Sequence, residues 1–283
     1  MKYRLKTYSI FEFGRRKDAD GNPHQEDCTF PMPDKLCDAD RTFILCDGMG
    51  GHDAGEVASA TVCETMGKSI IADGHDDDGI FTDDDLRKAI SDAFDALDSK
   101  DDPNAAKKMG TTMTLLKLHN EGATIAHIGD SRVYHIRPGA DGNATRILFQ
   151  TEDHSLINDL VKIGELTKEE ARTSPQKNVI TRAMQPNLQS RPKADIHHIA
   201  DIRPGDYFYL CSDGMLEQPD MEDGTTLRNV FSDAGGSAEE KVRILRKVTK
   251  DNGDNHTALI IHVRDVTDRP QSLFATLLHK IFH

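Results

Sequence analysis

The chain has 283 residues, of which 37% are hydrophobic, and its formal net charge is −13. This length suits one large domain or two small ones, and no stretch rich in Pro, Gly and Ser divides it, so we favour one domain. Nucleic acids and anionic membrane surfaces bind basic faces, so the acidic balance argues against both as partners.

The first part of the chain predicts a buried strand followed by two helices. Residues 42–46 are a short apolar run that ends at Asp47-Gly48, which is typical of a buried strand leading into a turn. Apolar residues then recur at helical spacing through residues 54–71 and again through residues 86–97.

The middle and the end of the chain predict grouped strands and further helices. Residues 113–118 and 123–128 are strand-like, and the polar stretch between them suits a hairpin turn. The remaining predicted elements are strands at 132–136, 207–211 and 257–263, and helices at 156–163, after Thr167 and around 242–248. His197 and His198 are also interpreted as strand residues rather than as ligands. Grouped hairpins and paired helices favour an α+β fold with mainly antiparallel sheets.

The cysteines and the two ends of the chain bear on its location. The five cysteines include no C-x-x-C pair, so we interpret them as reduced thiols of a cytoplasmic protein. No apolar stretch near the N-terminus indicates a secretory signal, and no run approaches ~18 apolar residues, so we expect no membrane span. Residues 266–283 predict an amphipathic tail, packed on the domain or on a partner rather than on a membrane.

Four acidic motifs lie at predicted turns: Gln25-Glu26-Asp27, Asp47-Gly48, Ser212-Asp213-Gly214 and Asp254-Asn255. Asp47 and Asp213 each follow an apolar strand, and Asp254 precedes one, so the three side chains can meet at one rim of a sheet. A single Asp-Gly pair is only a turn. Gathered carboxylates, however, repel one another unless a cation lies between them, and hard divalent cations prefer oxygen ligands. Together the motifs predict a two-metal hydrolytic site.

The segment F-I-L-C-D-G-M-G-G-H-D-A-G-E-V-A-S, residues 43–59, resembles the signature of the metal-dependent protein serine/threonine phosphatases, the PPM or type 2C family. Its M-G-G-H form is similar to the bacterial branch. Other motifs follow in the family's order across residues 8–264, namely Gly110-Thr111-Thr112, Gly129-Asp130-Ser131, Asp153-His154-Ser155 and the acidic motifs above. The resemblance implies a four-layer α+β sandwich over residues 1–265, with two stacked antiparallel sheets flanked by helix pairs.

The resemblance also implies an activity and a set of ligands. The activity is hydrolysis of phosphoserine and phosphothreonine in proteins, by direct attack of a water that bridges two divalent metals, Mg²⁺ or Mn²⁺. The implied ligands for two or three ions are Asp47 as the bridge, Glu26 and the Gly48 carbonyl for one ion, Asp213 and Asp254 for the other, and Asp130 with Asp213 for a third. Asp27 would orient ligands or waters.

Two positions depart from the family pattern. A phosphate-binding arginine is expected four residues before the glutamate, where this chain has Asn22. Residues 18–23 resemble a six-residue turn insertion, and without it Arg16 takes the expected place, with Arg15 as the alternative. Met49 stands where many eukaryotic members carry a histidine proposed to protonate the leaving group, and methionine cannot do this.

Two other functions stay open beside the phosphatase. One is a non-catalytic module of the same fold that binds phosphoproteins, and the other is hydrolysis of a small phosphoester. Expected partners are phosphorylated proteins and, by resemblance, a serine/threonine kinase. Residues 153–184 are similar to the family's flap beside the active site, and Arg172, Lys177 and Arg182 give this region cationic character. Its loop around residues 173–175 either contacts substrate or belongs to a solvated face.

Overall fold

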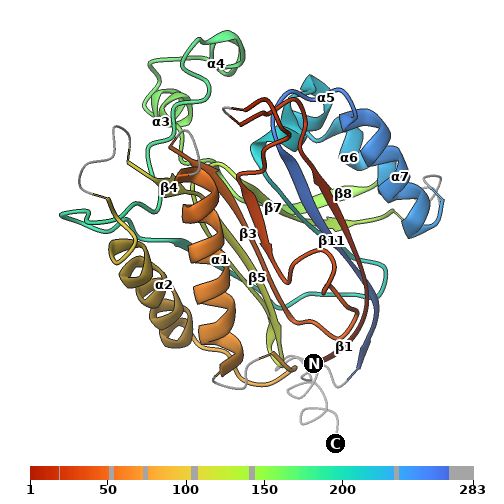
Figure 1. The fold of residues 1–283 in the computed structure, drawn as a ribbon. Helices are drawn as coiled ribbons and strands as arrows, with labels where there is room; N and C mark the ends of the chain where they lie inside the picture. The colour runs from red at the N-terminus through yellow and green to blue at the C-terminus, as the bar shows by residue number, and fades with distance from the viewer. Residues whose placement is uncertain are drawn as a thin grey trace, which may run out of the picture.

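Two antiparallel sheets stack face to face in the computed structural model, which describes residues 1–18, 20–50, 54–72, 76–102, 108–139, 144–232 and 236–267 (Figure 1). The first sheet has the order β1 (Lys2–Glu12), β11 (His256–Thr267), β10 (Tyr207–Cys211), β7 (Arg132–Arg137) and β8 (Arg146–Gln150). The second has the order β2 (Asp27–Phe30), β3 (Thr42–Met49), β5 (Met113–His119), β6 (Gly122–Ile128) and β9 (Asp195–Ile199), with β4 (Gly110–Thr111) beside β3.

Helices cover the outer faces of both sheets. The pair α1 (Ala54–Ala72) and α2 (Asp83–Asp98) lies on the second sheet, while α5 (Pro219–Glu222), α6 (Thr225–Val230) and α7 (Ala238–Thr249) lie on the other side (Figure 1). The short helices α3 (Leu156–Lys162) and α4 (Lys168–Thr173) project beyond the ends of the strands, at the top of the view. The predicted four-layer α+β sandwich is therefore confirmed.

Three hydrophobic clusters hold these layers together. Along β3, Phe43 packs between the two sheets, whereas the next residue, Ile44, packs under α1 and α2. Successive side chains of a strand point to opposite faces. Both faces of β3 are covered, which explains why its sequence is a continuous apolar run rather than an alternating one.

Most predicted elements lie within a few residues of their expected places. The strand predicted at 207–211 has the bounds of β10, and α1 begins at Ala54 as expected. The short helix after Thr167 is present, with reciprocal capping between Thr167 and Glu170. Strands β1, β2, β4 and β8 and the short helices α5 and α6 were not predicted.

The predicted tail, the membrane-span expectation and the cysteines can each be compared with the described residues. Strand β11 continues to Thr267, and the rest of the predicted tail lies outside the described residues. Within the ranges given above, no helix has the length and apolar character needed to span a bilayer. All five cysteines carry free thiols, and Cys46 and Cys211 are buried core residues.

Candidate active site

Asp47 and Gly48 lie near the end of β3, where the strand contacts the start of α1. The Asp47 N–H donates to the Thr112 hydroxyl, and the Asp47 carbonyl accepts from the Thr111 hydroxyl and the Thr112 N–H, each at 2.9 Å. A Cβ on Gly48 would lie 2.1 Å from the carbonyl oxygen of Gly55. Only glycine fits this close approach, so the backbone fixes the half-buried Asp47 beside the first turn of α1.

Glu26 directly precedes β2, and Asn255 fixes its backbone from the other sheet. The Glu26 N–H donates to Oδ1 of Asn255 at 2.9 Å, while the Glu26 carbonyl accepts from the Gly48 N–H at 3.0 Å. The Asn255 side-chain amide also donates to the carbonyls of Phe13 and His24, at 2.9 and 2.8 Å. One buried asparagine thus joins the segments before β2 and β11, a role that its motif position did not predict.

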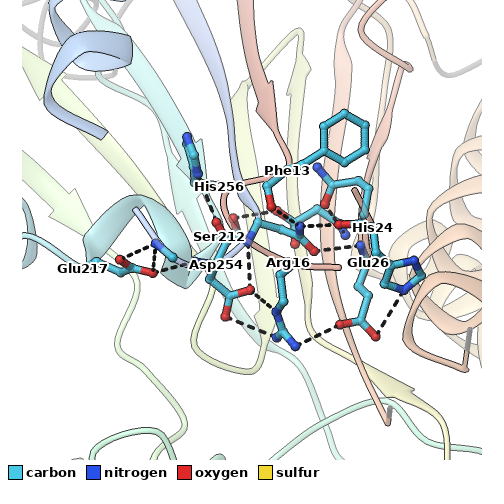
Figure 2. Close-up of polar contacts among 12 residues, drawn as sticks. Phe13, Arg16, His24, Glu26, Ser212, Glu217, Asp254 and His256 are labelled. Carbon is cyan, nitrogen blue, oxygen red and sulfur yellow. Dashed lines mark hydrogen bonds and ion pairs between the residues drawn. The ribbon is translucent and has the colours of Figure 1, made fainter. Parts of the chain in front are cut away.

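Arg16 lies between two carboxylates that come from opposite ends of the chain (Figure 2). Its Nε and Nη2 donate to the two carboxylate oxygens of Asp254 at 2.6 and 3.2 Å, and its Nη1 lies 3.4 Å from Oε2 of Glu26. Arg15 is engaged elsewhere, since its Nη2 donates to the Asp251 carbonyl at 2.9 Å. This geometry favours Arg16 over Arg15 as the arginine of the acidic cluster. The acidic cluster is the set of carboxylates that interact through their charges, namely Glu26, Asp27, Asp47, Asp130, Asp213 and Asp254.

The described part of residues 18–23 forms a closed turn. The Asp18 carboxylate accepts hydrogen bonds from the backbone N–H and the side-chain amide of Asn22, at 2.8 and 3.1 Å. After the turn, the His24 N–H donates to the Arg16 carbonyl at 3.2 Å. The inserted residues therefore leave and rejoin the chain at one place, and they do not move Arg16 away from the acidic cluster.

Asp213 and Asp254 come from neighbouring strands of the first sheet. Asp213 follows β10 and Asp254 precedes β11, and these strands run antiparallel, so the end of one meets the start of the other. Glu217 fixes this junction, because its carboxylate accepts from the Gly253 N–H and the Asp254 N–H, both at 2.8 Å (Figure 2). Sequence reasoning missed Glu217, because nothing in the spacing of the acidic motifs marks it.

Asp27 links the two sheets below the cluster. It pairs in register with Asp47, and its Oδ2 accepts a 2.9 Å hydrogen bond from the Ser212 hydroxyl at the end of β10. The Ser212 oxygen in turn accepts from the Thr257 N–H at 3.0 Å. Ser212 is therefore fully engaged in the link and is not poised as a nucleophile.

Burial and mutual repulsion raise the pKa values of several carboxylates of the acidic cluster. Burial, followed by the charges of neighbouring aspartates, raises the pKa of Asp27 and that of Asp130 to about 8. Burial and then the charges of Asp27 and Asp213 hold the pKa of Asp47 well above its usual range, and burial and Asp254 raise the pKa of Asp213. Such a cluster is ready to be stabilised by cations.

Two buried carboxylate oxygens of the acidic cluster have no hydrogen-bond donor in the described part of the chain, which is the environment that a bound cation would satisfy. Oδ1 of Asp27 and Oδ1 of Asp130 have no hydrogen-bond donor among the described residues. A buried carboxylate oxygen without a partner is costly unless a cation or another donor approaches it. Several oxygen donors on one surface are the ligands that Mg²⁺ and Mn²⁺ prefer. The residues present therefore fit the divalent ions that the resemblance implies.

A cavity of about 180 Å³ opens onto one side of this cluster. Its lining includes Asp130, Asp213 and Asp254 and, across from the strand ends, Ser155, Lys177 and Asn178. Lys177 of the predicted flap thus borders the acidic cluster. Arg182 is instead paired with Asp195 at 2.9 Å, and the Arg172 side chain lies outside the described part of the chain.

A second group of potential metal ligands was not predicted. In the described ranges, one group of three potential ligands has all its ligand atoms within 4.8 Å of one another, and it consists of His127, His154 and Asp195. The predicted carboxylates, which all lie in the same ranges, do not form such a group, so their oxygens lie farther apart. The two imidazoles stack at 4.5 Å, His154 Nδ1 accepts from the Gly129 N–H, and the Arg182 guanidinium lies 3.2 Å from His154 Nε2. A resident guanidinium disfavours a metal ion there, so we interpret this trio as a hydrogen-bond network.

Stacked antiparallel sheets between helix layers, with this acidic cluster at their strand ends, define the class of PPM phosphatases. The chain belongs to the protein phosphatase 2C family, whose model matches residues 13–248. The expected class of enzyme, a protein phosphatase that acts on serine and threonine phosphates, is confirmed by this membership.

Individual relatives and solved structures agree with the family. The protein phosphatase PhpP of Streptococcus pneumoniae is 33% identical over 233 residues, which is 80% of this chain and 88% of that protein. The PPM Ser-Thr phosphatase MsPP of Mycobacterium smegmatis, solved with cacodylate, superimposes with a TM-score of 0.69 at 27% identity, covering 93% of this chain and all of that one. The PstP catalytic domain, solved with two manganese ions, has a TM-score of 0.67 at 27% identity, covering 92% and 99% of the two chains.

Proposed function

We propose that this phosphatase hydrolyses phosphoserine and phosphothreonine in proteins with the help of two or three Mg²⁺ or Mn²⁺ ions. The observation that carries the proposal is the set of buried and half-buried carboxylates whose pKa values are raised by loss of solvent and by one another, with Arg16 as a neighbouring cation. Four such groups, namely Asp27, Asp47, Asp130 and Asp213, would be a poor structural core, because each charge is costly to bury alone.

The ligands would divide between the two sheets. Asp47 and the Gly48 carbonyl on β3, with Glu26 before β2, would hold one ion, and Asp213 with Asp254 at the β10–β11 junction would hold the other. Asp47 would bridge the two, and Asp130 with Asp213 would take a third. When bound, such ions lower the pKa of water and neutralise charge on a transferred phosphoryl group.

The chain's own residues would bind and orient the phosphate. Arg16 is 47% exposed and carries a planar guanidinium that matches two phosphate oxygens, so it can exchange its carboxylate contacts for the substrate. No described serine near the cluster is free to attack: Ser212 is bonded to Asp27, Ser131 to Thr112, and Ser155 caps α3. Direct transfer to water, without a covalent intermediate on the protein, agrees with this arrangement.

A two-part assay tests the proposal. The purified protein should hydrolyse an aryl phosphate when Mn²⁺ is present and stop when EDTA is added. Phosphopeptides and small phosphoesters are then compared by kcat/KM: higher values for phosphopeptides support a protein phosphatase, and the reverse supports the small-phosphoester alternative. No activity at saturating metal, with phosphopeptide binding retained, would favour the non-catalytic module instead.

Location and partners follow from the same proposal. Five free thiols suit a reducing compartment, so we place the protein in the cytoplasm. Its partners would be phosphorylated proteins and the serine/threonine kinase that modifies them. Detection of the native protein in a cytosolic fraction, rather than with membranes or in the medium, checks the location.

A further inference from the structure

A second cavity adjoins the candidate active site and lies between α3, α4 and α5. Its volume is about 540 Å³, within the range of roughly 300–1,000 Å³ that is common for ligand pockets. The two cavities share five lining residues: Arg132, Asp153, Ile157, Asn158 and Glu222. Because they share these walls, a peptide with its phosphate at the acidic cluster can place a neighbouring side chain in the second cavity.

One wall of the second cavity is apolar. Ile157 and Val161 both line it and are four residues apart on α3, so they lie on the same face of that helix. Ala171 of α4 adds a buried methyl group. This wall offers contact to the methylene groups of a side chain rather than to a polar one.

The rim of the cavity carries excess negative charge. Its basic residues are already paired: Arg132 donates two hydrogen bonds to Asp153, at 2.7 and 2.6 Å, and Lys162 lies 3.2 Å from Glu152. Glu222, at the end of α5, is exposed and forms no ion pair with any described side chain. The adjacent Asp223 also lines the cavity, and its Oδ1 accepts a 2.8 Å hydrogen bond from the Thr225 N–H.

We infer that this cavity is a subsite for a lysine or arginine side chain that lies near the phosphorylated residue in the substrate. The inference rests on the proposed function. Lysine and arginine place a methylene chain along apolar surface while their charged head stays at a polar edge, which matches the wall of Ile157 and Val161 and the rim at Glu222. An acidic side chain is repelled from that rim, and an aliphatic one leaves Glu222 without a cation.

The test is a set of phosphopeptides with one arginine moved through the positions on both sides of the phosphoresidue, in a neutral background. For the parent protein with Mn²⁺, arginine at one or two positions should raise kcat/KM roughly two- to fivefold, the effect of a partly exposed ion pair. In Glu222→Gln the ratio of basic to neutral peptide should fall towards one, and in Glu222→Lys the preference should change to glutamate. Added salt should reduce the parent's preference.

Glu121→Gln is the matched control. Glu121 is exposed in the β5–β6 turn, and β5 begins beside the Thr112 that binds Asp47 and ends at His119, so this turn lies at the far end of the sheet. The basic preference should persist in that variant. An unchanged preference in Glu222→Gln, or equal rates on all peptides, overturns the subsite while the phosphatase proposal stands. If the parent protein with Mn²⁺ hydrolyses none of the peptides, the proposed function is refuted, and the subsite is refuted with it.

Discussion

The Arg16 guanidinium donates its Nε–H to Oδ1 of Asp254 at 2.6 Å, across 238 positions of sequence. This contact places the proposed phosphate-binding arginine directly against a proposed metal ligand. A hydrogen bond to Asp254 is also the main cause that raises the pKa of Arg16 above its usual range, so the side chain stays charged at any pH of interest. The cation is thus held ready at the edge of the acidic cluster.

Replacing Arg16 should impair phosphate binding. We expect Arg16→Ala to lower kcat/KM for an aryl phosphate by about ten- to a hundredfold, the loss of one or two charge-assisted hydrogen bonds, and to raise the inhibition constant of inorganic phosphate. Arg16→Lys should recover only part of the rate, because an ammonium cannot bind two oxygens side by side. Arg15→Ala is the control, since Arg15 bonds to Asp251; a larger loss there than in Arg16→Ala would reverse the assignment.

Removing one carboxylate should separate activity from stability. We expect Asp213→Asn to reduce kcat/KM by at least about a hundredfold, because the metal ions stabilise the transition state by several kcal/mol and depend on this ligand set. In EDTA the same variant should unfold at a higher temperature than the parent, since it removes a charge that Asp254 repels. Asp34→Asn, at an exposed aspartate, should change neither kcat/KM nor the unfolding temperature in EDTA. An Asp213→Asn protein as active as the parent would refute the site.

The raised pKa values of Asp27 and Asp130 predict how pH acts on the metal-free protein. Both have a folded pKa of about 8 against an ordinary value of 3.8, so the folded state retains protons that the unfolded chain has lost. The free energy of unfolding should therefore fall as pH rises from about 4 to about 8 and then level off. Thermal unfolding in EDTA across this range measures the slope.

Metal ions should reverse this trend. Ligand carboxylates bind metal in the ionised form, so Mg²⁺ should release protons on binding, with more released near pH 6 than near pH 9. Calorimetry in buffers of different ionisation enthalpy counts those protons.

In EDTA, Asp27→Asn should flatten the fall in the free energy of unfolding with rising pH. A slope as steep as the parent's would show that Asp27 is not one of the causes of that fall.

The fold was largely predictable because both sheets are covered on both faces. Buried strands such as β3 and β10 are continuous apolar runs that end abruptly at Asp-Gly, which makes them easy to find. β1 was not predicted because its first half alternates buried residues with two lysines and one arginine that are exposed, and β8 was not predicted because three of its five residues are exposed. Polar strands resemble loops when no partner is known.

The site was predictable only where a motif was local. Aspartates at strand ends could be proposed from their neighbours, whereas the supports of those aspartates lie far away in sequence. Ser212 reaches Asp27 across 185 positions, and Asn255 joins Glu26 across 229. Contacts at such separations depend on how the two sheets stack, which no spacing within a motif encodes.

Glu217 should affect metal binding without being one of the proposed ligands, because it holds the backbone of Asp254. Its two oxygens accept from the Gly253 and Asp254 N–H groups, and this fixes the turn that carries Asp254. Glu217→Gln keeps the shape but presents an amide N–H₂ to one of these donors, so the turn should loosen.

We expect Glu217→Gln to weaken Mn²⁺ binding by about tenfold, the usual effect of changing a group that orients a ligand. At saturating Mn²⁺ most of the activity should return, since the ligands themselves are intact. Asp220→Asn, an exposed acidic residue three positions along, removes the same charge without touching the turn and should bind Mn²⁺ like the parent. Equal losses of affinity in both variants would mean that charge near the site matters, rather than the hydrogen bonds of Glu217 to the backbone. Titration calorimetry with Mn²⁺ on the three proteins decides between these two explanations.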